Sequence, residues 1–153
     1  MSPSDHAVVV SPAGPIATDV LNPGLDTLHS LRVPVYWPDE RWREDVHRRQ
    51  GYLAGSDEDR ATQLKRAVEL SPRGVWMARG GYGCIRTLDR AAGLFEGQPV
   101  PLWGFSDGTA LLAAWCRANW PAWHAPPLSQ LPRLDPDSAR RVGIAWHEGE
   151  VAP

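Results

Sequence analysis

The chain has 153 residues, of which 42% are hydrophobic and 22% are charged, and its formal net charge is −2. This size and composition suffice for the core of one domain without disulfide or metal staples, and they exclude a disordered or fibrous protein. The 16 basic and 18 acidic residues form no long run of either sign, so we expect neither nucleic acid nor a membrane as a partner.

Four short apolar runs, each bounded by glycine or proline, predict buried β-strands. They cover residues 7–10, 33–36, 74–78 and 100–105. After the second of these strands, a segment around residues 39–49 mixes arginines with acidic residues. We interpret this segment as a solvated, ion-paired surface.

Helices are predicted between and after the strands. The clearest covers residues 56–70, where Ser56 can cap the helix and Asp59 stands at the third helical position, close to a capping box. Two more are expected near 85–94 and 107–119. Alternating strands and helices predict parallel pairing with right-handed crossovers. We therefore expect an α/β fold: a doubly wound, flavodoxin-like, mostly parallel sheet with helices on both faces.

From Trp120 onward the sequence is rich in proline, and we expect only a short helix near residues 137–142 in a surface loop or linker. This divides the chain into an α/β domain over residues 1–131 and a tail or linker remnant over 132–153. Eight tryptophans in so short a chain need burial or a partner. Those expected to mark a surface that something else covers are Trp120, Trp123 and Trp146.

The two cysteines and the amino-terminal sequence indicate a cytoplasmic protein. Cys84 and Cys116 form no closely spaced pair, which favours reduced thiols over a disulfide framework or a zinc site. We prefer burial for Cys84 to a role as nucleophile. The first ten residues have no basic segment followed by a long apolar core, and nowhere do eighteen apolar residues follow one another.

The segment GFSDG at residues 104–108 matches G-x-S-x-G, in which a serine sits on a strained turn between a strand and a helix. The context fits, because a strand-like run precedes Ser106 and a helix-like run follows it. The start of that helix offers backbone N–H groups and a positive dipole end to an oxyanion. Ser106 or Asp107 can equally be an ordinary helix cap, so the motif alone leaves both interpretations open.

A second informative segment, RGGYG at residues 79–83, joins a strand-like run to a helix. Its glycines let the backbone adopt positive φ and leave N–H groups free to face an anion. Because ligands of open α/β sheets bind beyond the carboxyl ends of strands, this loop and Ser106 are expected to meet. Two interpretations of this loop compete: half of an oxyanion hole, or a phosphate-binding loop. The phosphate-binding loop is the weaker interpretation, because the segment lacks the lysine of a P-loop. Arg79 and Tyr82 can bind a carboxylate and pack a ligand.

Together, four segments resemble the amino-terminal domain of the LD-carboxypeptidases, a serine peptidase family of muramoyltetrapeptide carboxypeptidases and related microcin immunity proteins. They are SPAGPI at 11–16, GYLAGSDEDRATQL at 51–64, ARGGYG at 78–83 and GFSDGTAL at 104–111. The resemblance makes residues 1–131 the nucleophile domain. It implies a cytosolic enzyme that removes the terminal D-alanine from L,D-linked tetrapeptides during murein recycling.

The same resemblance implies roles for individual residues. Ser106 is the nucleophile, and the backbone N–H groups of Asp107 and Gly81 form the oxyanion hole. The residues implied to line the substrate cleft are Arg79, Gly80, Tyr82, Ser11 and Gly14. The expected partner is a murein peptide or a related small peptide, and no metal or organic cofactor is expected.

The sequence departs from the family pattern in two places. The family's catalytic glutamate and histidine come from a carboxy-terminal domain, whereas this chain stops at Pro153, so we expect that domain to be absent and the isolated chain to be inactive or weakly active. Gly108 replaces a β-branched or larger apolar residue. His124 and His147 are the local candidates for a base, although nothing in their spacing brings them to Ser106.

Several alternatives stay open. The chain can be a catalytically inactive module that binds peptides or murein fragments, or a phosphate-binding flavodoxin-like protein. An α/β-hydrolase-like esterase is the weakest alternative, because little of the chain follows Ser106. A homodimer through exposed tryptophans or a complementing carboxy-terminal domain remains an open partner.

Overall fold

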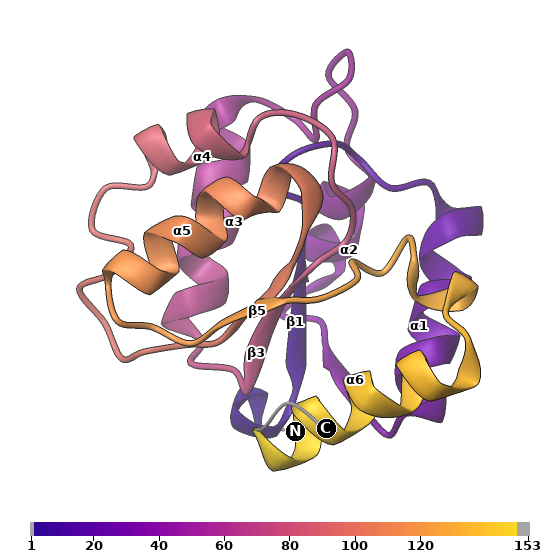
Figure 1. Cartoon of the computed structure of the whole chain (residues 1–153). Helices are drawn as coiled ribbons and strands as arrows, with labels where there is room; N and C mark the ends of the chain where they lie inside the picture. Colours follow the sequence, from indigo (N-terminus) through magenta and orange to yellow (C-terminus); the bar gives the residue numbers. More distant parts are fainter. Residues whose placement is uncertain (1, 150–153) are drawn as a thin grey trace.

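The apolar runs lie side by side as parallel strands in the computed structural model, which describes residues 2–149 (Figure 1). The strands are β1 (Ala7–Val10), β2 (Val35–Tyr36), β3 (Gly74–Met77), β4 (Leu102–Gly104) and β5 (Ala122–His124). Their order in the sheet is β2-β1-β3-β4-β5, and every pair is parallel. This is one of the common doubly wound orders, with its switch point between β1 and β3. The predicted α/β class is confirmed.

Within residues 2–149, six α-helices and three short 3-10 helices connect and flank the strands. The α-helices are α1 (Thr18–Ser30), α2 (Glu40–His47), α3 (Asp57–Glu69), α4 (Cys84–Arg90), α5 (Thr109–Arg117) and α6 (Pro136–Glu148). The 3-10 helices are η1 (Pro3–Asp5), η2 (Ser106–Gly108) and η3 (Leu131–Arg133). The predicted capping box begins α3: the Asp59 N–H donates to Ser56 Oγ at 3.1 Å, and the Ser56 N–H donates to Asp59 Oδ2 at 3.0 Å. Among the described residues, no helix is long and apolar enough to cross a bilayer.

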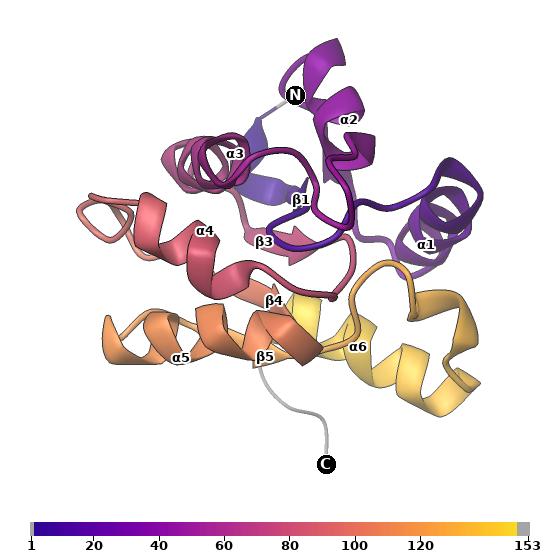
Figure 2. The same ribbon diagram turned by 90° about the horizontal axis from the view of Figure 1, so that it is seen from above.

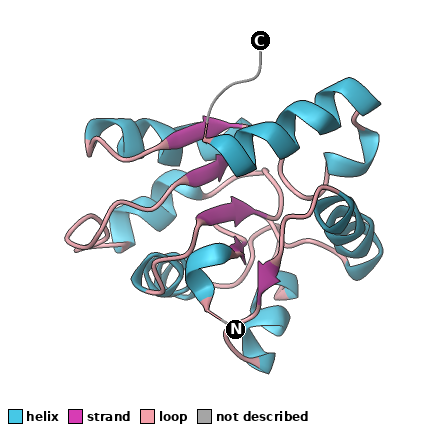
Figure 3. Cartoon of the chain, turned by 90° about the horizontal axis from the view of Figure 1, so that it is seen from below, coloured by secondary structure: helices cyan, strands magenta, loops and turns pink. Residues whose placement is uncertain are grey.

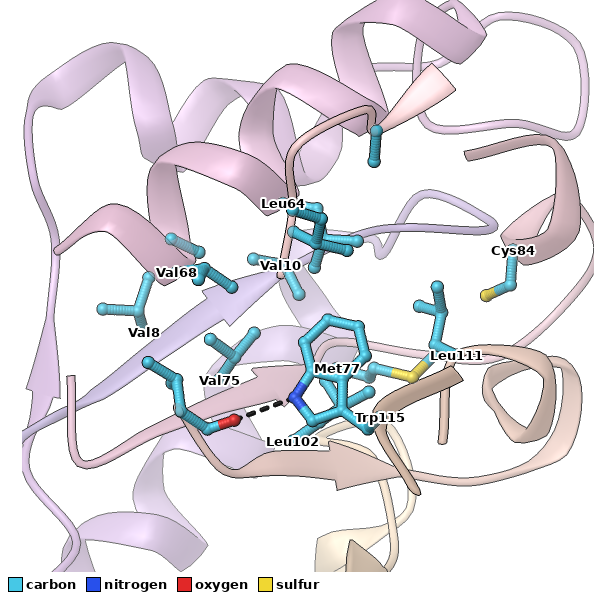
Figure 4. Packing of buried hydrophobic residues seen from close by; sticks show 14 of the residues in the cluster. Val8, Val10, Leu64, Val68, Val75, Met77, Cys84, Leu102, Leu111 and Trp115 are labelled. Carbon is cyan, nitrogen blue, oxygen red and sulfur yellow. Dashed lines mark hydrogen bonds between the residues drawn. The ribbon is translucent and has the colours of Figure 1, made fainter. Parts of the chain in front are cut away.

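Helices cover both faces of the sheet, as predicted (Figures 2 and 3). Successive strand residues point to opposite faces, so Val8 and Val75 pack with α3, α4 and α5. Val9 and Trp76 pack on the other face with α1 and α6. On the first face Met77 lies close to Leu111 and Trp115, and the Trp115 indole N–H donates to the Val100 carbonyl at 2.8 Å (Figure 4).

Two α-helices and one strand were not predicted from the sequence: α1, α2 and β5. The charged segment that we interpreted as a solvated surface forms α2, of which Trp42 and Val46 are buried while most of the charged residues face solvent. An ion pair between Arg48 and Asp45 at 2.7 Å agrees with that interpretation for the outer face. The buried face of α2 therefore consists of only two apolar residues, Trp42 and Val46.

The proline-rich end of the chain is more ordered than predicted. The short helix expected at 137–142 is the 13-residue α6, whose Asp135 N-cap accepts from the Asp137 and Ser138 amides. The Arg73 guanidinium donates to the Trp146 carbonyl at 2.9 Å and thereby fixes α6 to the start of β3. Within the described part of residues 132–153, α6 is packed against the sheet. Residues 150–153 of the predicted tail lie outside the described residues.

The expectation that tryptophans mark an uncovered surface is wrong for Trp120 and Trp146, which are only 7% and 3% exposed. Trp146 of α6 lies 5.6 Å from Trp103, measured between ring centroids. Trp123 is half-buried and stacks on Trp103 at 4.8 Å. Helix α6 therefore covers Trp103 on one face of the sheet, whereas Trp120 is buried on the other face, where it meets Phe95 edge-on at 5.2 Å.

Candidate active site

Three loops follow the carboxyl ends of β1, β3 and β4 and meet beside the switch point of the sheet. They comprise residues 11–17, 78–83 and 105–108. The first two are joined by a hydrogen bond in which the Gly14 N–H donates to the Gly80 carbonyl at 3.4 Å. This edge of an open α/β sheet is the usual place for a ligand.

Ser106 occupies the strained turn that its motif predicts. It follows β4 directly, opens η2, and has a φ of 61°. This is the left-handed region, which costs a residue with a Cβ about 1–3 kcal/mol and persists where the surrounding structure fixes it. The Ser106 side chain is exposed.

The alternative in which Ser106 or Asp107 caps the following helix is wrong. Neither η2 nor α5 has a side-chain cap. The Asp107 carboxylate instead reaches the next helix, where it accepts the Cys84 backbone N–H at 2.8 Å. Asp107 thus connects the serine turn to the start of α4.

The two glycines that flank the serine are required by packing. A Cβ built on Gly104 or on Gly108 would overlap the Met77 sulfur of the neighbouring strand. Neither glycine has a positive φ. Met77 therefore fills the space that a larger residue at 108 would occupy, which gives a physical reason for the departure from the family pattern.

The glycine loop and the serine turn converge. A Cβ on Gly80 would lie 2.9 Å from Ser106 Cβ and 3.0 Å from Ser106 Oγ. Gly81 and Gly83 have φ values of 129° and 122°, which side chains rarely allow. Neither the Gly81 amide nor the Asp107 amide donates to another of residues 2–149, so both are free to face a ligand.

The other residues predicted to line a cleft fall into two groups. Arg79 and Tyr82 are exposed at this edge; the Arg79 guanidinium donates to the Pro15 carbonyl at 3.3 Å, and Tyr82 meets the Tyr52 ring edge-on at 5.9 Å. Ser11 is different, because it is 1% exposed and its hydroxyl donates to the Val46 carbonyl at 3.0 Å. The prediction that the Ser11 side chain lines a cleft is therefore wrong.

Gly14 and Gly80 contribute only backbone to the site. A Cβ on Gly14 would lie 3.2 Å from the Gly80 carbonyl oxygen, and a Cβ on Gly81 would lie 3.3 Å from the Gly14 nitrogen. These close approaches explain why the SPAGPI and ARGGYG segments are glycine-rich at the points where they touch.

Sequence reasoning missed Arg60, a buried arginine that supports these loops. Its guanidinium donates to the carbonyls of Pro12 at 3.2 Å and Gly55 at 2.8 Å, donates to Thr87 Oγ1 at 3.0 Å, and pairs with Asp57. The side chain is 1% exposed. A signal existed, since helical periodicity from the Ser56 cap places residue 60 on the same face as Leu64, which packs in the core.

Cys84 is buried, as we preferred, and is unsuited to nucleophilic chemistry. Burial and then the neighbouring Asp107 carboxylate raise the pKa of the Cys84 thiol far above its usual range, so the reactive thiolate is not populated near neutral pH. Within residues 2–149, no group of three or more His, Cys, Asp or Glu residues is arranged to hold a metal ion.

Neither local histidine provides a base for Ser106. His147 lies beyond the amino-terminal ends of the strands, opposite the end that carries Ser106. Its ring contacts the Leu31 carbonyl at 2.9 Å, and its own carbonyl accepts a hydrogen bond from Arg73. His124 ends β5 at the same edge as the serine, but its ring packs edge-on against Phe105 at 5.9 Å. In the described part of the chain, no histidine or carboxylate forms a hydrogen bond with Ser106 Oγ.

Comparison with known proteins gives a consistent result. The family model of the LD-carboxypeptidase N-terminal domain matches residues 8–125. The murein tetrapeptide carboxypeptidase of Pseudomonas aeruginosa is 39% identical over 139 residues, which cover 89% of this chain and 43% of that protein.

Solved structures show the same fold at lower identity. The muramoyltetrapeptide carboxypeptidase of Oxalobacter formigenes superposes with a TM-score of 0.74 at 22% identity, covering 92% of this chain and 47% of the other. The microcin C7 self-immunity protein MccF superposes with a TM-score of 0.79 at 16% identity, covering 95% and 45%. The chain spans less than half the length of each of these proteins.

Proposed function

The chain belongs to the LD-carboxypeptidase family through that amino-terminal domain, and we propose that it is the nucleophile-bearing part of a serine carboxypeptidase for L,D-linked murein tetrapeptides. The observation that carries the proposal is the Ser106 turn: a serine with a φ of 61° whose Oγ lies 3.0 Å from the Cβ position of Gly80. The murein relatives support the substrate class. A cytoplasmic location, where murein fragments are recycled, is part of the same proposal.

In the proposed reaction, Ser106 Oγ attacks the carbonyl carbon of the peptide bond that precedes the terminal D-alanine. The carbonyl oxygen becomes an oxyanion, which accepts hydrogen bonds from the Gly81 and Asp107 amides. Collapse of this intermediate breaks the C–N bond, releases D-alanine, and leaves an acyl ester on Ser106. Water then hydrolyses the ester and regenerates the hydroxyl.

A base has to accept the Ser106 proton and pass it to the leaving amine. No described residue is placed for this role. We propose that a glutamate–histidine pair comes from the part of the family's length that this chain does not span, since the chain covers only 43% of the Pseudomonas relative. The 153-residue chain alone is then weakly active, because general base catalysis contributes about 10²- to 10⁴-fold.

The second candidate function is a binding module that holds a peptide or a murein fragment without chemistry. The observation that favours it is the missing base at Ser106 among residues 2–149. A phosphate-binding protein is less well supported, because the Ser106 hydroxyl faces the glycine loop. Membership of the LD-carboxypeptidase family argues against the alternative of an α/β-hydrolase-like esterase.

A serine-directed fluorophosphonate probe distinguishes the enzyme from the binding module. The 153-residue chain is treated alone and together with the carboxy-terminal part of the Pseudomonas aeruginosa relative, beyond the matched region. We expect complementation to raise the labelling rate by about 10²- to 10⁴-fold and to start D-alanine release from an L,D-tetrapeptide.

Two variants control the experiment. Ser106→Ala removes labelling, whereas Ser30→Ala, at the end of α1, leaves it unchanged. Binding of the tetrapeptide without labelling would support the binding module. Labelling at another residue, or full activity of the 153-residue chain alone, would contradict the proposed division of roles.

A further inference from the structure

Buried polar groups are concentrated beneath the loop that follows β1. Five polar side chains are buried within residues 2–149, and four of them fix the backbone of residues 11 and 12: Ser11, Arg60, Gln63 and Thr87. Arg60 and Gln63 belong to α3 and Thr87 to α4, and these helices lie side by side (Figure 2). The chemistry proposed at Ser106 gives none of these side chains a role.

Two donors of this cluster converge on one carbonyl. The Thr87 hydroxyl donates to the Pro12 carbonyl at 2.8 Å, and Arg60 Nε donates to the same oxygen at 3.2 Å. Arg60 Nε also donates to Thr87 Oγ1 at 3.0 Å, so the guanidinium holds the hydroxyl in place. Because proline has no N–H group, this carbonyl is the only backbone group of residue 12 that can form a hydrogen bond.

The neighbouring residues on both sides are held as well. The Ser11 N–H donates to Gln63 Oε1 at 2.8 Å, and the Ala13 carbonyl accepts from the Ala54 N–H at 2.9 Å. Three consecutive residues of the loop are thus fixed from below. The next residue, Gly14, therefore has a defined position relative to the sheet.

Gly14 connects this loop to the peptide group that joins Gly80 to Gly81. The Gly14 N–H donates to the Gly80 carbonyl at 3.4 Å. A trans peptide group is planar, so its C=O and its N–H point in opposite directions. The hydrogen bond at the Gly80 oxygen therefore sets the direction of the Gly81 N–H, which is a proposed oxyanion donor.

This peptide group depends on support from outside its own segment. It lies between two glycines, which restrict its orientation little, and Gly81 has a φ of 129°. A donor–acceptor distance of 3.4 Å is longer than the usual distance of about 2.9–3.0 Å, so the hydrogen bond is weak. It can orient the peptide group only while Gly14 stays in place. Arg60 also limits the end of this loop, because a Cβ on Gly83 would lie 3.2 Å from Arg60 Nη2.

Stability alone does not explain a buried arginine at this point. Arg60 is 1% exposed, and taking a guanidinium out of water has a large desolvation cost. Apolar side chains of similar volume often stabilise a core at least as well. The rigid fork of a guanidinium donates in several fixed directions at once, which suits a residue that fixes the geometry of a loop.

We propose that Arg60 and Thr87 are positioning residues for the oxyanion hole. By holding the Pro12 carbonyl, they fix the loop whose Gly14 amide orients the Gly81 N–H. The inference rests on the proposed function, which makes Gly81 an oxyanion donor. Arg60 and Thr87 act through the backbone of two loops and do not contact the substrate.

Thr87 offers the sharpest test, because its hydroxyl and its methyl group can be removed separately. Thr87→Val removes the donor to Pro12 and keeps the shape of the side chain, whereas Thr87→Ser keeps the donor. Hydrogen exchange of the 153-residue chain, followed by NMR, measures the protection of the buried Gly14 amide. We expect Thr87→Val to lower this protection about three- to tenfold, the contribution of one hydrogen bond, and Thr87→Ser to keep it within about twofold.

Turnover of the L,D-tetrapeptide by the complemented chain tests the role in catalysis. An oxyanion contact acts on the transition state, so Thr87→Val should lower kcat about three- to tenfold and leave KM within about twofold. In Gly14→Ala the new Cβ would lie 3.2 Å from the Gly80 oxygen and push the two loops apart. This variant should lower kcat at least about tenfold, since misplacement by about 1 Å can cost about 10²-fold. If Arg60→Lys folds, it should resemble Thr87→Val, because an ammonium group lacks the fork.

Two controls separate positioning from stability. Val68→Ala shortens a buried side chain near the end of α3, away from the loops, and Thr62→Val makes the same change as Thr87→Val at an exposed position of α3. Both should leave kcat and the protection of Gly14 unchanged. Unchanged Gly14 protection in Thr87→Val, or equal losses of kcat in Thr87→Ser and Val68→Ala, would overturn the inference.

Failure of the positioning role and failure of the proposed function have different signatures. A complemented parent chain that neither releases D-alanine nor reacts with the serine probe would reject the proposed function. The role of the network in an oxyanion hole would then be rejected too, even if Thr87→Val lowered the protection of Gly14. An active parent whose kcat is unchanged in Thr87→Val would keep the hydrolase and reject the positioning role.

Discussion

Replacing Gly104 or Gly108 with alanine tests whether Met77 is the reason for the two glycines beside Ser106. Both glycines have backbone angles that alanine can adopt, and Gly108 has a φ of −59°. The lower entropy of the unfolded chain would then stabilise each variant by about 0.4–1 kcal/mol. Any destabilisation must therefore come from the contact with Met77.

The structure predicts different costs at the two positions. A Cβ at residue 104 would overlap the Met77 sulfur and would also lie 2.9 Å from Met77 Cγ and 3.2 Å from Met77 Cβ, which are the less mobile part of that side chain. A Cβ at 108 would meet only the sulfur and the terminal methyl, at 2.7 Å from Cε. Overpacking costs about 1–3 kcal/mol, so we expect a loss of about 2 kcal/mol for Gly104→Ala and at most about 1 kcal/mol for Gly108→Ala.

Urea unfolding of the single and double variants measures these free energies. Met77→Ala alone should cost about 2–5 kcal/mol, because Met77 is fully buried. In the double variant Met77→Ala/Gly104→Ala the added methyl no longer clashes, and we expect a coupling energy of about 1–3 kcal/mol. Additivity within about 0.5 kcal/mol, or a larger cost at 108 than at 104, would refute the reasoning.

Three further predictions concern backbone strain, capping and thiol reactivity. Ser106→Gly should raise the free energy of unfolding by about 1 kcal/mol in the same urea assay, because glycine adopts a positive φ without strain; an unchanged or lower value would contradict the strained turn. Ser56→Ala should cost about 1 kcal/mol. Hydrogen bonds from the Ser56 amide and hydroxyl hold the pKa of Asp59 below its ordinary value of 3.8. The stability gained from ionised Asp59 is therefore present above pH 3.8 and is lost as the pH falls through the lowered pKa of the folded protein. If the difference in free energy of unfolding between the parent and Asp59→Asn grew on acidification, this reasoning would be wrong. Iodoacetamide should modify exposed Cys116 in the folded protein and Cys84 only after unfolding, which peptide mass mapping checks; rapid modification of Cys84 would contradict its burial and raised pKa.

The strands and the serine turn could be predicted because their signals are local. A buried parallel strand reads as a short apolar run, and β1, β3 and β4 all begin within or at the edge of the predicted runs. The motif around Ser106 likewise lies within five residues. By contrast, α1 contains Pro23 and Gly24, both of which disfavour a helix interior. The close approach of Leu128 that uses Gly24 is a long-range contact, and no local pattern reveals it.

The carboxy-terminal segment was underestimated for a similar reason. Proline-rich stretches predict loops, yet β5 pairs with β4 through Trp103 and Trp123, and α6 buries Trp146 against the sheet. Whether a tryptophan is covered depends on where a distant helix packs. Sequence composition shows that burial is required, and only the fold shows which part of the chain provides it.

Ser11 and Arg60 show where prediction of the site fails. Both stand in segments that resemble the family, and the resemblance placed Ser11 in the cleft. In the structure the Ser11 hydroxyl faces Val46, while Arg60 holds the Pro12 carbonyl beneath the loops. A segment that resembles the family thus indicates that a loop has a fixed shape. It does not tell which side chains point outward.

The proposed division of labour follows from the topology of the sheet. The proposed oxyanion donors and the proposed nucleophile lie on loops that follow neighbouring parallel strands, so one α/β sheet can position all of them. The Ser106 side chain is exposed, so a base can approach it from the solvent side, where no histidine or carboxylate of residues 2–149 forms a hydrogen bond with Ser106 Oγ. If the base is supplied from outside this domain, electrostatic stabilisation and proton transfer are separable, and complementation should raise the turnover number much more than it changes the affinity for the tetrapeptide. A complement that tightened tetrapeptide binding tenfold while leaving turnover unchanged would contradict this separation.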